Sequence, residues 1–505
     1  MSLRKAFHLV IVVNLVLCTS FVPLAAKSEL ISTPASPTTV RDVCASDCTY
    51  SSIQAAINDS GSGDIIDLAA ETFTEPITIN ENITLSGAGA GSTIIQAGST
   101  PTNATQRVVT VLVTTTVTIQ GVTIRYGKTS GGGGIHNRGV LTVTNSIITN
   151  NNVTNNGAGI FNNGKDSVDH AVLTIIDSVI SNNTGGNARG GGIYNYANNG
   201  DATINLIRTE IHGNSNQYGG GISNYANYGV ATLNLSQTQI YNNSGTAQGG
   251  GIDNWAWNLN SEANISIWDS TIDNNTILFN GGGLYNHSFQ GVTDVELFNS
   301  TISYNTAYDF GGGIYNYADG YSSDIALTNV TISYNSADDG AGIYNYGKRS
   351  PANINIIAST INSNIAASDY TGGIYNDRLT DEIGSSAIIT MTGSILANNV
   401  DYDCNTVVAH GAVFNNTGYN IIETNVDGSC GTAITDDPAL GPLQDNGGPT
   451  FTHALLEGSP AIDAIPPGSC LVSMDQRGVM RPIGDGCDIG AYEYGFLAFL
   501  PLIIR

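Results

Sequence analysis

The feature that most constrains the fold is a repeated phrase of glycines followed by an apolar residue, a variable residue and asparagine. Its clearest copy is Gly311-Gly312-Gly313-Ile314-Tyr315-Asn316. The closing asparagines are about 30 residues apart, and a near-constant period of this length is typical of a solenoid. The copies are Gly132–Asn137, Gly157–Asn162, Gly190–Asn195, Gly219–Asn224, Gly249–Asn254, Gly281–Asn286, Gly311–Asn316, Gly340–Asn345 and Gly372–Asn376.

A second phrase, Ile-x-x-Asn, runs in step with the first, from Ile148–Asn151 to Ile395–Asn398. Apolar and polar residues alternate between the phrases, and clusters of Gly and Asn interrupt them. This pattern predicts three short strands and three turns in each repeat. In one repeat the expected strands are Ile193–Tyr196, Ala202–Ile207 and Glu210–His212, and the last expected turn is Asn214–Gly221. Such a repeat is one coil of a parallel β-helix, in which coils stack about 4.8 Å apart.

Both phrases have a structural explanation. An inward asparagine at the same point of every coil can bond its neighbours above and below, and so form a ladder that satisfies buried turn backbone. The glycines permit positive φ angles and close approach of backbones at a corner. No helix opens after the glycines, as a phosphate-binding loop requires. We therefore expect the phrases to hold the coils together.

Charge limits the partners of this chain. Its 505 residues have a formal net charge of −25, and only 12% of them are charged. Nucleic-acid binding needs clustered Lys and Arg, so this composition argues against DNA and RNA. It also disfavours unaided binding of polyanionic glycans, although calcium could bridge such a ligand. The expected form is a monomer.

The amino-terminal region predicts export. Residues 1–26 have the basic start, apolar stretch and small cleavage-site residues of a secretory signal peptide, and residues 27–43 resemble a linker in composition. Six cysteines remain after the signal, and an even number in an exported protein predicts disulfides. Many pairings are open, and we favour the one between sequence neighbours: Cys44–Cys48, Cys404–Cys430 and Cys470–Cys487. The expected location is secreted or at the cell surface.

Two resemblances support the β-helix. Tyr50–Asn58 can form a short amphipathic helix that covers the first coil, and strands are expected at Asp64–Leu68, Ile77–Ile79 and Ile83–Gly89. Ser52–Ile57, Gly63–Leu68 and Ile83–Gly89 resemble the opening of pectate-lyase-like right-handed β-helix proteins. The repeats between residues 132 and 398 resemble those of bacterial polymorphic outer-membrane proteins, a family of surface adhesins, with Ile in place of Phe in the second phrase.

The carboxy-terminal region differs from the repeats. Asp445–Thr450, Gly458–Asp463, Asp475–Gly478 and Asp488–Glu493 resemble the choice-of-anchor module of exported bacterial β-helix proteins. In that family the module precedes a variable sorting or anchoring tail, which implies envelope attachment here. Residues 496–505 are almost entirely apolar and too short to span a bilayer. They are either a sorting or docking signal or a final capping strand.

These features predict an all-β fold, a right-handed parallel β-helix with a short amino-terminal capping helix and a small disulfide-stabilised carboxy-terminal module. The β-helix is expected over residues 44–435, with regular repeats at 131–400. The module is expected over 436–495, followed by the tail.

The first phrase also predicts two outward columns, because residues alternate across a strand. The first column is His136, Phe161, Tyr194, Ser223, Asp253, Tyr285, Tyr315, Tyr344 and Tyr375, and the second is Arg138, Asn163, Tyr196, Tyr225, Trp255, His287, Tyr317, Tyr346 and Asp377. Aromatic rings with polar edges suit binding to sugars, but tyrosine is also a good strand former. The candidate glycan-binding residues are Tyr194, Tyr196, Tyr225, Trp255, Trp257, Tyr285, Tyr315, Tyr317, Tyr344, Tyr346 and Tyr375.

The largest departure from the consensus lies near residue 253. Asp253 replaces the aromatic residue, His287 occupies the next coil, and all three tryptophans lie between residues 255 and 268. Asp253, Asp269 and His287 are therefore candidate catalytic residues, since a carboxylate beside aromatic rings can act as an acid in a glycosidase. The carboxylate could equally accept a sugar hydroxyl, bind calcium or be solvated.

Two functions follow from these observations. The first is an exported adhesive or glycan-binding protein whose partner is an extracellular polysaccharide or cell-surface glycan. The alternative is an extracellular polysaccharide lyase or glycoside hydrolase. A lyase needs a base together with calcium or Arg, but the basic residues are scattered. Asp401 and Asp403 are weak candidates for a calcium site. A stalk without a ligand is the third possibility.

Overall fold

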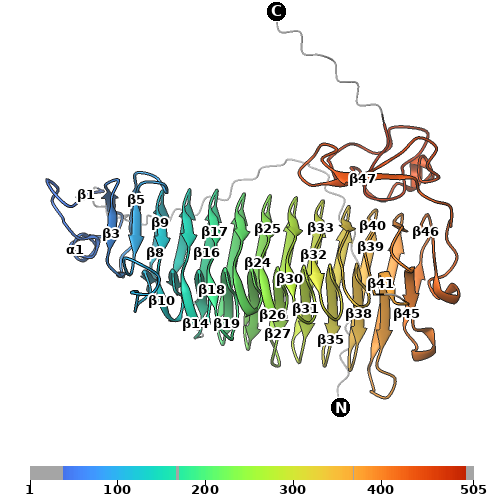
Figure 1. Cartoon of the computed structure of the whole chain (residues 1–505), viewed down its shortest axis with the longest axis horizontal. Helices are drawn as coiled ribbons and strands as arrows, with labels where there is room; N and C mark the ends of the chain where they lie inside the picture. The colour runs from blue at the N-terminus through green and yellow to red at the C-terminus, as the bar shows by residue number, and fades with distance from the viewer. Residues whose placement is uncertain (1–37, 167–169, 368, 496–505) are drawn as a thin grey trace, which may run out of the picture. The chain divides into compact units, whose positions relative to one another are not determined.

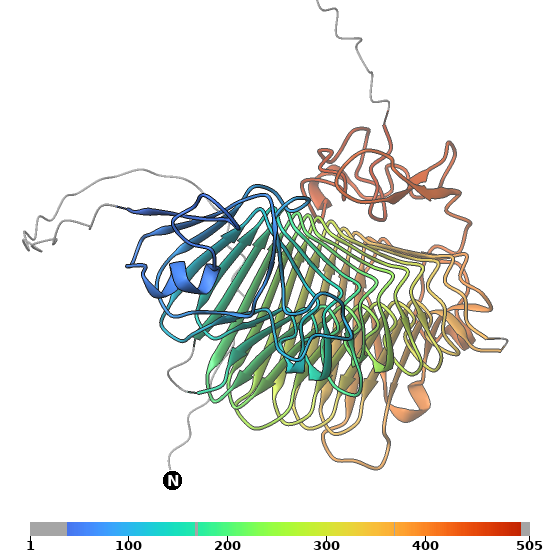
Figure 2. The same ribbon diagram turned by 60° about the vertical axis from the view of Figure 1, so that its left-hand side comes forward.

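The computed structural model describes residues 38–166, 170–367 and 369–495. The predicted signal peptide, most of the predicted linker and the apolar tail lie outside the described residues. The described chain is a parallel β-helix, so the predicted fold class is confirmed. Consecutive coils stack in sequence order, as Figures 1 and 2 show.

Sheet A is the longest face of the β-helix and contains 14 strands. Neighbouring strands pair in parallel, each with the equivalent strand of the next coil. In order they are β1 (Val40–Val43), β2 (Ile65–Leu68), β5 (Thr84–Gly87), β8 (Thr116–Gln120), β12 (Val140–Thr144), β16 (His170–Ile176), β20 (Asp201–Ile207), β24 (Val230–Ser236), β28 (Glu262–Trp268), β32 (Val292–Phe298), β36 (Ser323–Thr328), β39 (Pro351–Ile357), β42 (Ser386–Thr392) and β45 (Val413–Asn416).

Sheet B follows sheet A in each coil and contains 13 short strands. They contain the isoleucines of the Ile-x-x-Asn phrase. In order they are β3 (Thr72–Thr74), β6 (Ile94–Gln96), β9 (Thr123–Arg125), β13 (Ile147–Thr149), β17 (Val179–Ser181), β21 (Glu210–His212), β25 (Gln239–Tyr241), β29 (Thr271–Asp273), β33 (Thr301–Ser303), β37 (Thr331–Ser333), β40 (Thr360–Asn362), β43 (Ile395–Ala397) and β46 (Ile421–Ile422).

Sheet C contains 12 strands and carries the residues that follow the glycines. In order they are β4 (Ile77–Ile79), β7 (Val109–Val111), β11 (Ile135–Asn137), β15 (Ile160–Gly164), β19 (Ile193–Asn198), β23 (Ile222–Asn227), β27 (Ile252–Ala256), β31 (Leu284–Ser288), β35 (Ile314–Ala318), β38 (Ile343–Gly347), β41 (Thr371–Arg378) and β44 (Tyr402–Thr406).

Sheet D lies between sheets B and C and contains seven strands. It corrects the prediction of three strands in each coil, because most central coils have four. The expected turn Asn214–Gly221 includes β22 (Ser215–Tyr218), a run whose polar residues give no alternation to detect. The other strands are β10 (Lys128–Gly131), β14 (Asn152–Asn156), β18 (Thr184–Gly185), β26 (Ser244–Gln248), β30 (Thr276–Ile277) and β34 (Thr306–Ala307).

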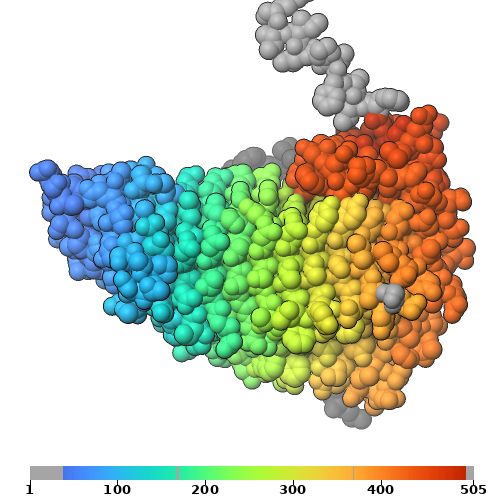
Figure 3. Space-filling model, in the orientation of Figure 1, coloured from blue at the N-terminus to red at the C-terminus, as the bar shows by residue number. Residues whose placement is uncertain are grey.

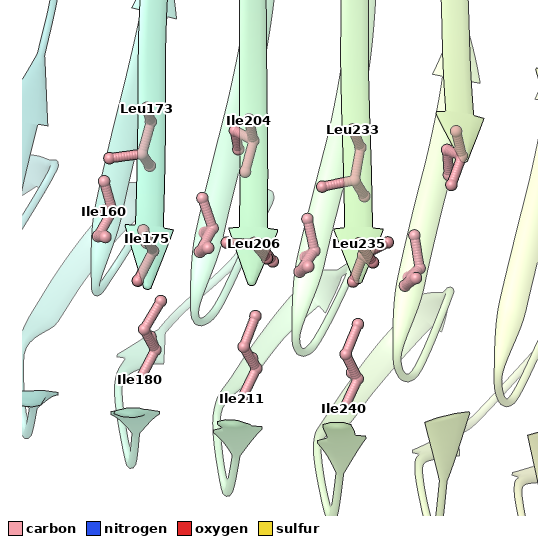
Figure 4. Close-up of a cluster of buried hydrophobic side chains, with 14 of the residues drawn as sticks. Ile160, Leu173, Ile175, Ile180, Ile204, Leu206, Ile211, Leu233, Leu235 and Ile240 are labelled. Carbon is pink, nitrogen blue, oxygen red and sulfur yellow. The ribbon is translucent and has the colours of Figure 1, made fainter. Parts of the chain in front are cut away.

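The interior is filled by columns of Ile, Leu and Val. Each column consists of the inward side chains at equivalent positions of successive coils. Figure 4 shows these columns pointing into the coils, with Ile160 from sheet C, Leu173 and Ile175 from sheet A, and Ile180 from sheet B. All four side chains are fully buried. Each buried apolar side chain contributes about 1.5–3 kcal/mol, so this repeated filling is the main stabilisation of a solenoid whose repeats contact only their neighbours.

Two asparagine ladders run through the corners, as predicted. In the first, each Nδ2 donates to the Oδ1 of the next coil at 2.7–2.9 Å, from Asn137 to Asn376. In the second, the Nδ2–Oδ1 distances are 2.8–3.0 Å, from Asn151 onward. The amides also bond buried backbone groups, for example Asn214 Nδ2 to the Ile180 carbonyl at 2.9 Å.

The second ladder ends differently from the prediction. It continues through Asn399 and not Asn398, because Leu396 rather than Ile395 pairs with Ile361. Asn399 then donates through its backbone N–H and Nδ2 to Asp403 Oδ1 at 3.0 and 2.8 Å.

The amino-terminal end is closed by β1 and by α1 (Ile53–Asn58). Composition places residues 40–43 in a linker, but they form β1 because Val43 is buried and Arg41 forms an ion pair with Asp64 at 3.0 Å. The predicted helix exists, and Ser52 caps it by accepting a hydrogen bond from the Ala55 N–H. Figure 2 shows α1 at the end of the stack, where it covers the first coil.

The carboxy-terminal module, residues 436–495, packs along the outer face of sheet B. It contains the antiparallel pair β47 (Leu440–Gln444) and β48 (Thr452–Leu455), and its apolar residues share a cluster with Ile395 and Ile421 of sheet B. The buried Gln476 donates to Thr301 Oγ1 at 3.0 Å and accepts from Thr331 Oγ1 at 2.7 Å. Figures 1 and 3 show this module against the later coils. It therefore has no apolar core separate from the β-helix.

The three predicted disulfides are present: Cys44–Cys48, Cys404–Cys430 and Cys470–Cys487. Three 3₁₀ helices, η1 (Val408–His410), η2 (Val426–Gly428) and η3 (Pro467–Ser469), lie in the irregular region after the last regular coil. Within residues 38–166, 170–367 and 369–495, no helix is long and apolar enough to cross a membrane.

Candidate functional site

The two predicted outward columns lie on sheet C, and the strand register aligns their residues as expected. Tyr194 pairs with Ser223, Ser223 with Asp253, and Asp253 with Tyr285. In the second column Tyr225 pairs with Trp255, and Trp255 with His287.

The first column is buried, which corrects the expectation that outward positions face solvent. Tyr194, Tyr285, Tyr315 and Tyr344 are 3, 2, 8 and 9% exposed. Two contacts explain this burial. Equivalent rings stack across coils, as in Tyr285–Tyr315 at 5.3 Å, and the glycine turn lies against them, so that a Cβ added at Gly281 would meet the Cβ of Tyr285 at 2.7 Å. The first column is therefore mainly structural, and Tyr375 at its end is only half-buried.

The second column forms a continuous run of rings, which we call the aromatic row: Tyr196, Tyr225, Trp255, His287, Tyr317 and Tyr346. Successive ring centroids are 5.7, 6.2, 4.7, 4.5 and 5.9 Å apart. The four tyrosines are half-buried, while Trp255 and His287 are buried. The accessible part of the row is therefore formed by its four tyrosines, of which Tyr317 donates its hydroxyl to Asp319 Oδ2 at 3.2 Å.

Trp257 extends this surface beside the row. Its indole stacks on Phe289 at 4.6 Å and meets Trp255 edge-on at 5.2 Å. On the other side of the indole lies a short ladder of amides, in which Asn258 Nδ2 donates to Asn227 Oδ1 at 2.6 Å and Asn227 Nδ2 to Asn198 Oδ1 at 2.9 Å. Indole faces and amides are both suited to sugar rings and hydroxyls.

Asp253 lies beside the centre of the row, two residues before Trp255 on β27, and forms a largely buried ion pair with Arg189. Arg189 Nη1 contacts Asp253 Oδ2 at 2.5 Å, and the Ser223 hydroxyl donates to the same oxygen at 2.7 Å. The guanidinium of Arg189 also lies 4.4–4.5 Å from the rings of Tyr218, Tyr225 and Trp255. Asp253 has no exposed surface, so we interpret the ion pair as a structural contact between coils.

Burial dominates the protonation chemistry of this centre. Desolvation raises the pKa of Asp253, and Arg189 and the Ser223 hydroxyl oppose that shift. Desolvation lowers the pKa of His287 to about 3, so its ring is neutral at neutral pH. The phenol of Tyr225 has its pKa raised to about 12, also by desolvation. His287 and Tyr225 are therefore uncharged near pH 7.

Several buried polar atoms of these two coils have no hydrogen-bond partner among the described residues. They are Gln248 Oε1, Asp253 Oδ1, Trp255 Nε1, Asn280 Oδ1 and His287 Nε2. Buried polar groups are nearly always paired, so a concentration of unpaired ones indicates a place where water or a ligand binds. These atoms are themselves buried, so they lie beneath the surface that the row presents.

The other candidate residues lie elsewhere. Asp269 is at the turn between β28 and β29 and accepts a hydrogen bond from Asn299 Nδ2 at 3.1 Å, so it does not join Asp253 and His287. Asp403 is buried and accepts from Asn399 and from the Thr424 N–H and hydroxyl at 2.6–3.0 Å. Asp401 is exposed. Within the described part of the chain, no group of three or more potential metal ligands occurs.

The sequence did not reveal that Arg189 pairs with Asp253. The two residues are 64 positions apart, and Arg189 pairs across two coils rather than one. Arg189 directly precedes one copy of the glycine phrase, and Asp253 follows the glycines of the copy two repeats later. The separation of about two periods was the signal in the sequence that could have indicated this contact.

Comparisons with known proteins give no family. No family model matches the chain, and no curated protein matches it. Among solved structures, pectate lyase Pel9A is 13% identical, with 91% of this chain and 98% of that chain covered and a TM-score of 0.37. Escherichia coli YbhC is 13% identical, with 56% and 78% covered and a TM-score of 0.30. The β-helix fold therefore rests on the strand pairing, and the function rests on the site.

Proposed function

We propose that the chain is an exported protein that binds a neutral polysaccharide along the aromatic row on the outer face of sheet C. The observation that carries this proposal is the row itself, six rings on six neighbouring strands, four of them half-buried tyrosines. Strands in a sheet are about 4.8 Å apart. A linear ligand with a short repeat would meet a similar set of groups on every coil.

The accessible polar groups of the row and of the amide ladder beside it support a ligand rich in hydroxyls. The four half-buried tyrosines carry phenol groups, and Asn198, Asn227 and Asn258 carry amides that are also half-buried. A sugar hydroxyl can donate and accept, so it matches either kind of group. The neutral ligand follows from charge, because the formal net charge of −25 is unfavourable for binding a polyanion.

Export and attachment are parts of the same proposal. Three disulfides suit an oxidising compartment. The choice-of-anchor-like module packs on sheet B, away from the row, and its contacts use Thr301, Thr331 and Thr360. Attachment through the module and tail would therefore leave the row free, as a surface adhesin requires.

The enzymatic alternative has less support from the geometry. A lyase or hydrolase centred on Asp253 needs that carboxylate to reach its substrate. Asp253 is completely buried, and its carboxylate is paired with Arg189. His287 is neutral and buried, and Asp269 lies at a different corner. A binding surface requires none of these groups to exchange protons.

The test is affinity electrophoresis of the purified protein in gels that contain glucomannan, xylan, β-glucan or polygalacturonate, with and without calcium. We expect retardation by at least one neutral polymer and a loss of about tenfold or more in affinity for Tyr196→Ser/Tyr225→Ser, because each lost ring contact is worth about 0.5–1.5 kcal/mol. Tyr304→Ser/Tyr334→Ser is the matched control, since these two rings also stack, at 5.1 Å, but lie at the corner after β33 and β37, away from the row. Unchanged retardation of the row variant would overturn the proposal.

A further inference from the structure

A column on the outer face of sheet A lacks a large side chain at one position. The strand register aligns Ile207, Ser236, Trp268 and Phe298 on consecutive coils. Ser236 is therefore a small residue between two large ones. The hollow above it has a volume of about 440 Å³, within the range of roughly 300–1,000 Å³ that small-ligand sites occupy.

Trp268 forms one wall of this hollow and is held rigidly. Its indole stacks on Phe298, with centroids 4.7 Å apart and planes 10° from parallel. Because Phe298 covers the carboxy-terminal face of the ring, the opposite face is turned toward Ser236. Trp268 is 45% exposed, which is unusual for so large an apolar side chain. A ring fixed in this way loses little conformational entropy when it binds a ligand.

The spacing of the walls fits one ring. Ile207 and Trp268 are two strands apart, or about 9.6 Å at the usual strand spacing. A ring that contacts both walls needs about 7–8 Å, since carbon atoms in contact are about 3.5–4.0 Å apart. One ring therefore fits edgewise between the walls, and two do not.

The slot is lined by apolar residues and by polar residues that carry no charge. The lining residues include Asn205, Asn234, Ser236 and Ser266. Asn234 Nδ2 donates to Asn205 Oδ1 at 2.9 Å, which fixes both amides and leaves Asn234 Oδ1 available to accept a hydrogen bond. Amides and hydroxyls bordering an indole face bind a ligand that has an apolar ring face and hydroxyls at its edge.

We propose that this slot, with Ile207 and Trp268 as walls and Ser236 as floor, binds a single pyranose ring of a neutral glycan. An aromatic ring would stack equally well but would leave the surrounding amides and hydroxyls unused. A protein side chain would need a partner surface, and the slot is bounded on both sides. The slot lies on sheet A and the aromatic row on sheet C, so binding at one can be tested independently of binding at the other.

The three tryptophans allow the two sites to be tested in one experiment. The protein is labelled with 5-fluorotryptophan, and its ¹⁹F resonances are assigned with single Trp→Phe variants. It is then titrated with cellohexaose, xylohexaose or mannohexaose. The resonance of Trp268 reports on the slot, whereas those of Trp255 and Trp257 report on the row.

Ser236→Phe is the decisive variant, because it fills the slot and completes the ring column without removing any core group. Thr328→Phe is its matched control, since Thr328 follows Phe298 in the same column outside the slot. We expect a saturable shift of the Trp268 resonance in the wild type and in Thr328→Phe, and an affinity at least about tenfold weaker in Ser236→Phe. The absence of any response of Trp268 to the three glycans, or an equal response in Ser236→Phe, would overturn the proposal whatever Trp255 and Trp257 do.

Discussion

The buried pair of Arg189 and Asp253 allows a quantitative test of whether Asp253 has a structural role. Removing one partner of a buried ion pair typically costs about 3–5 kcal/mol, because the other charge remains buried without compensation. Arg189 is 14% exposed, and Ser223 still donates to Asp253, so the lower end of that range applies. We expect Arg189→Met to lower the free energy of unfolding by about 3 kcal/mol at pH 7.5. Methionine keeps contact with the surrounding rings.

The other variants of the cycle separate the charge from the packing. Asp253→Asn keeps the shape of the side chain and leaves Arg189 against three aromatic rings, so we expect a loss of about 1–2 kcal/mol. The double variant contains neither charge and should lose less than the two single losses combined. The resulting coupling free energy should be about 2 kcal/mol. The assay is urea unfolding followed by circular dichroism and tryptophan fluorescence.

The pH dependence gives a second test of the same reasoning. Burial already raises the pKa of Asp253, and without Arg189 this pKa rises further. Between about pH 4 and that raised value, the native state of Arg189→Met binds a proton that the unfolded state lacks. The stability contributed by this protonation is present at low pH and is lost as the pH rises through the folded-state value. The cost of Arg189→Met should therefore be smaller at pH 4 than at pH 7.5. A coupling below about 0.5 kcal/mol, or a loss independent of pH, would refute the argument.

Two further predictions concern the corners and the outer face of sheet B. Asn254→Ala removes a donor to the Ala263 carbonyl and to Asn286, and it removes the acceptor for Asn224. Urea unfolding should therefore show a free energy of unfolding lower by about 2–4 kcal/mol. The control Asn415→Ala, at an exposed position, should change this free energy little. Desolvation raises the pKa of Asp273 to about 6, so its contribution to stability is present at low pH and lost as the pH rises through about 6. Asp273→Asn should then be more stable than the wild type at pH 7.5, by about 1–2 kcal/mol, and not at pH 4; an equal difference at both pH values would contradict the assignment.

Much of the fold was predictable because each coil repeats the same short sequence patterns. The period, the inward isoleucines, the asparagine ladders and the alignment of Tyr194 with Asp253 all follow from counting residues. Sheet D was missed since strands such as β22 contain only polar residues and a tyrosine. Asn399 was missed because the last coil holds one residue more than the phrase predicts.

The candidate site was less predictable because burial depends on neighbouring coils. The sequence gives the direction of Tyr285 from its strand but not the glycine turn and stacked ring that cover it. The partner of Asp253 lies two coils away, so no local pattern contains both residues. The slot at Ser236 is visible only once the register aligns it with Ile207 and Trp268.

The second asparagine ladder has a direction, and this direction affects how the stack of coils ends. Every side-chain oxygen accepts from the preceding asparagine and every Nδ2 donates to the next one, so the small dipoles of the amides add along the ladder, while the Nδ2 groups also donate to carbonyls of the preceding coil. Its positive end meets the carboxylate of Asp403, much as an anion caps the start of an α-helix. The other oxygen of Asp403 accepts from the Thr424 N–H and hydroxyl at 2.7 and 2.6 Å, so both ends of this carboxylate are used within the chain. The row of asparagine donors thus ends on a buried acceptor and leaves no unpaired amide at the last coil.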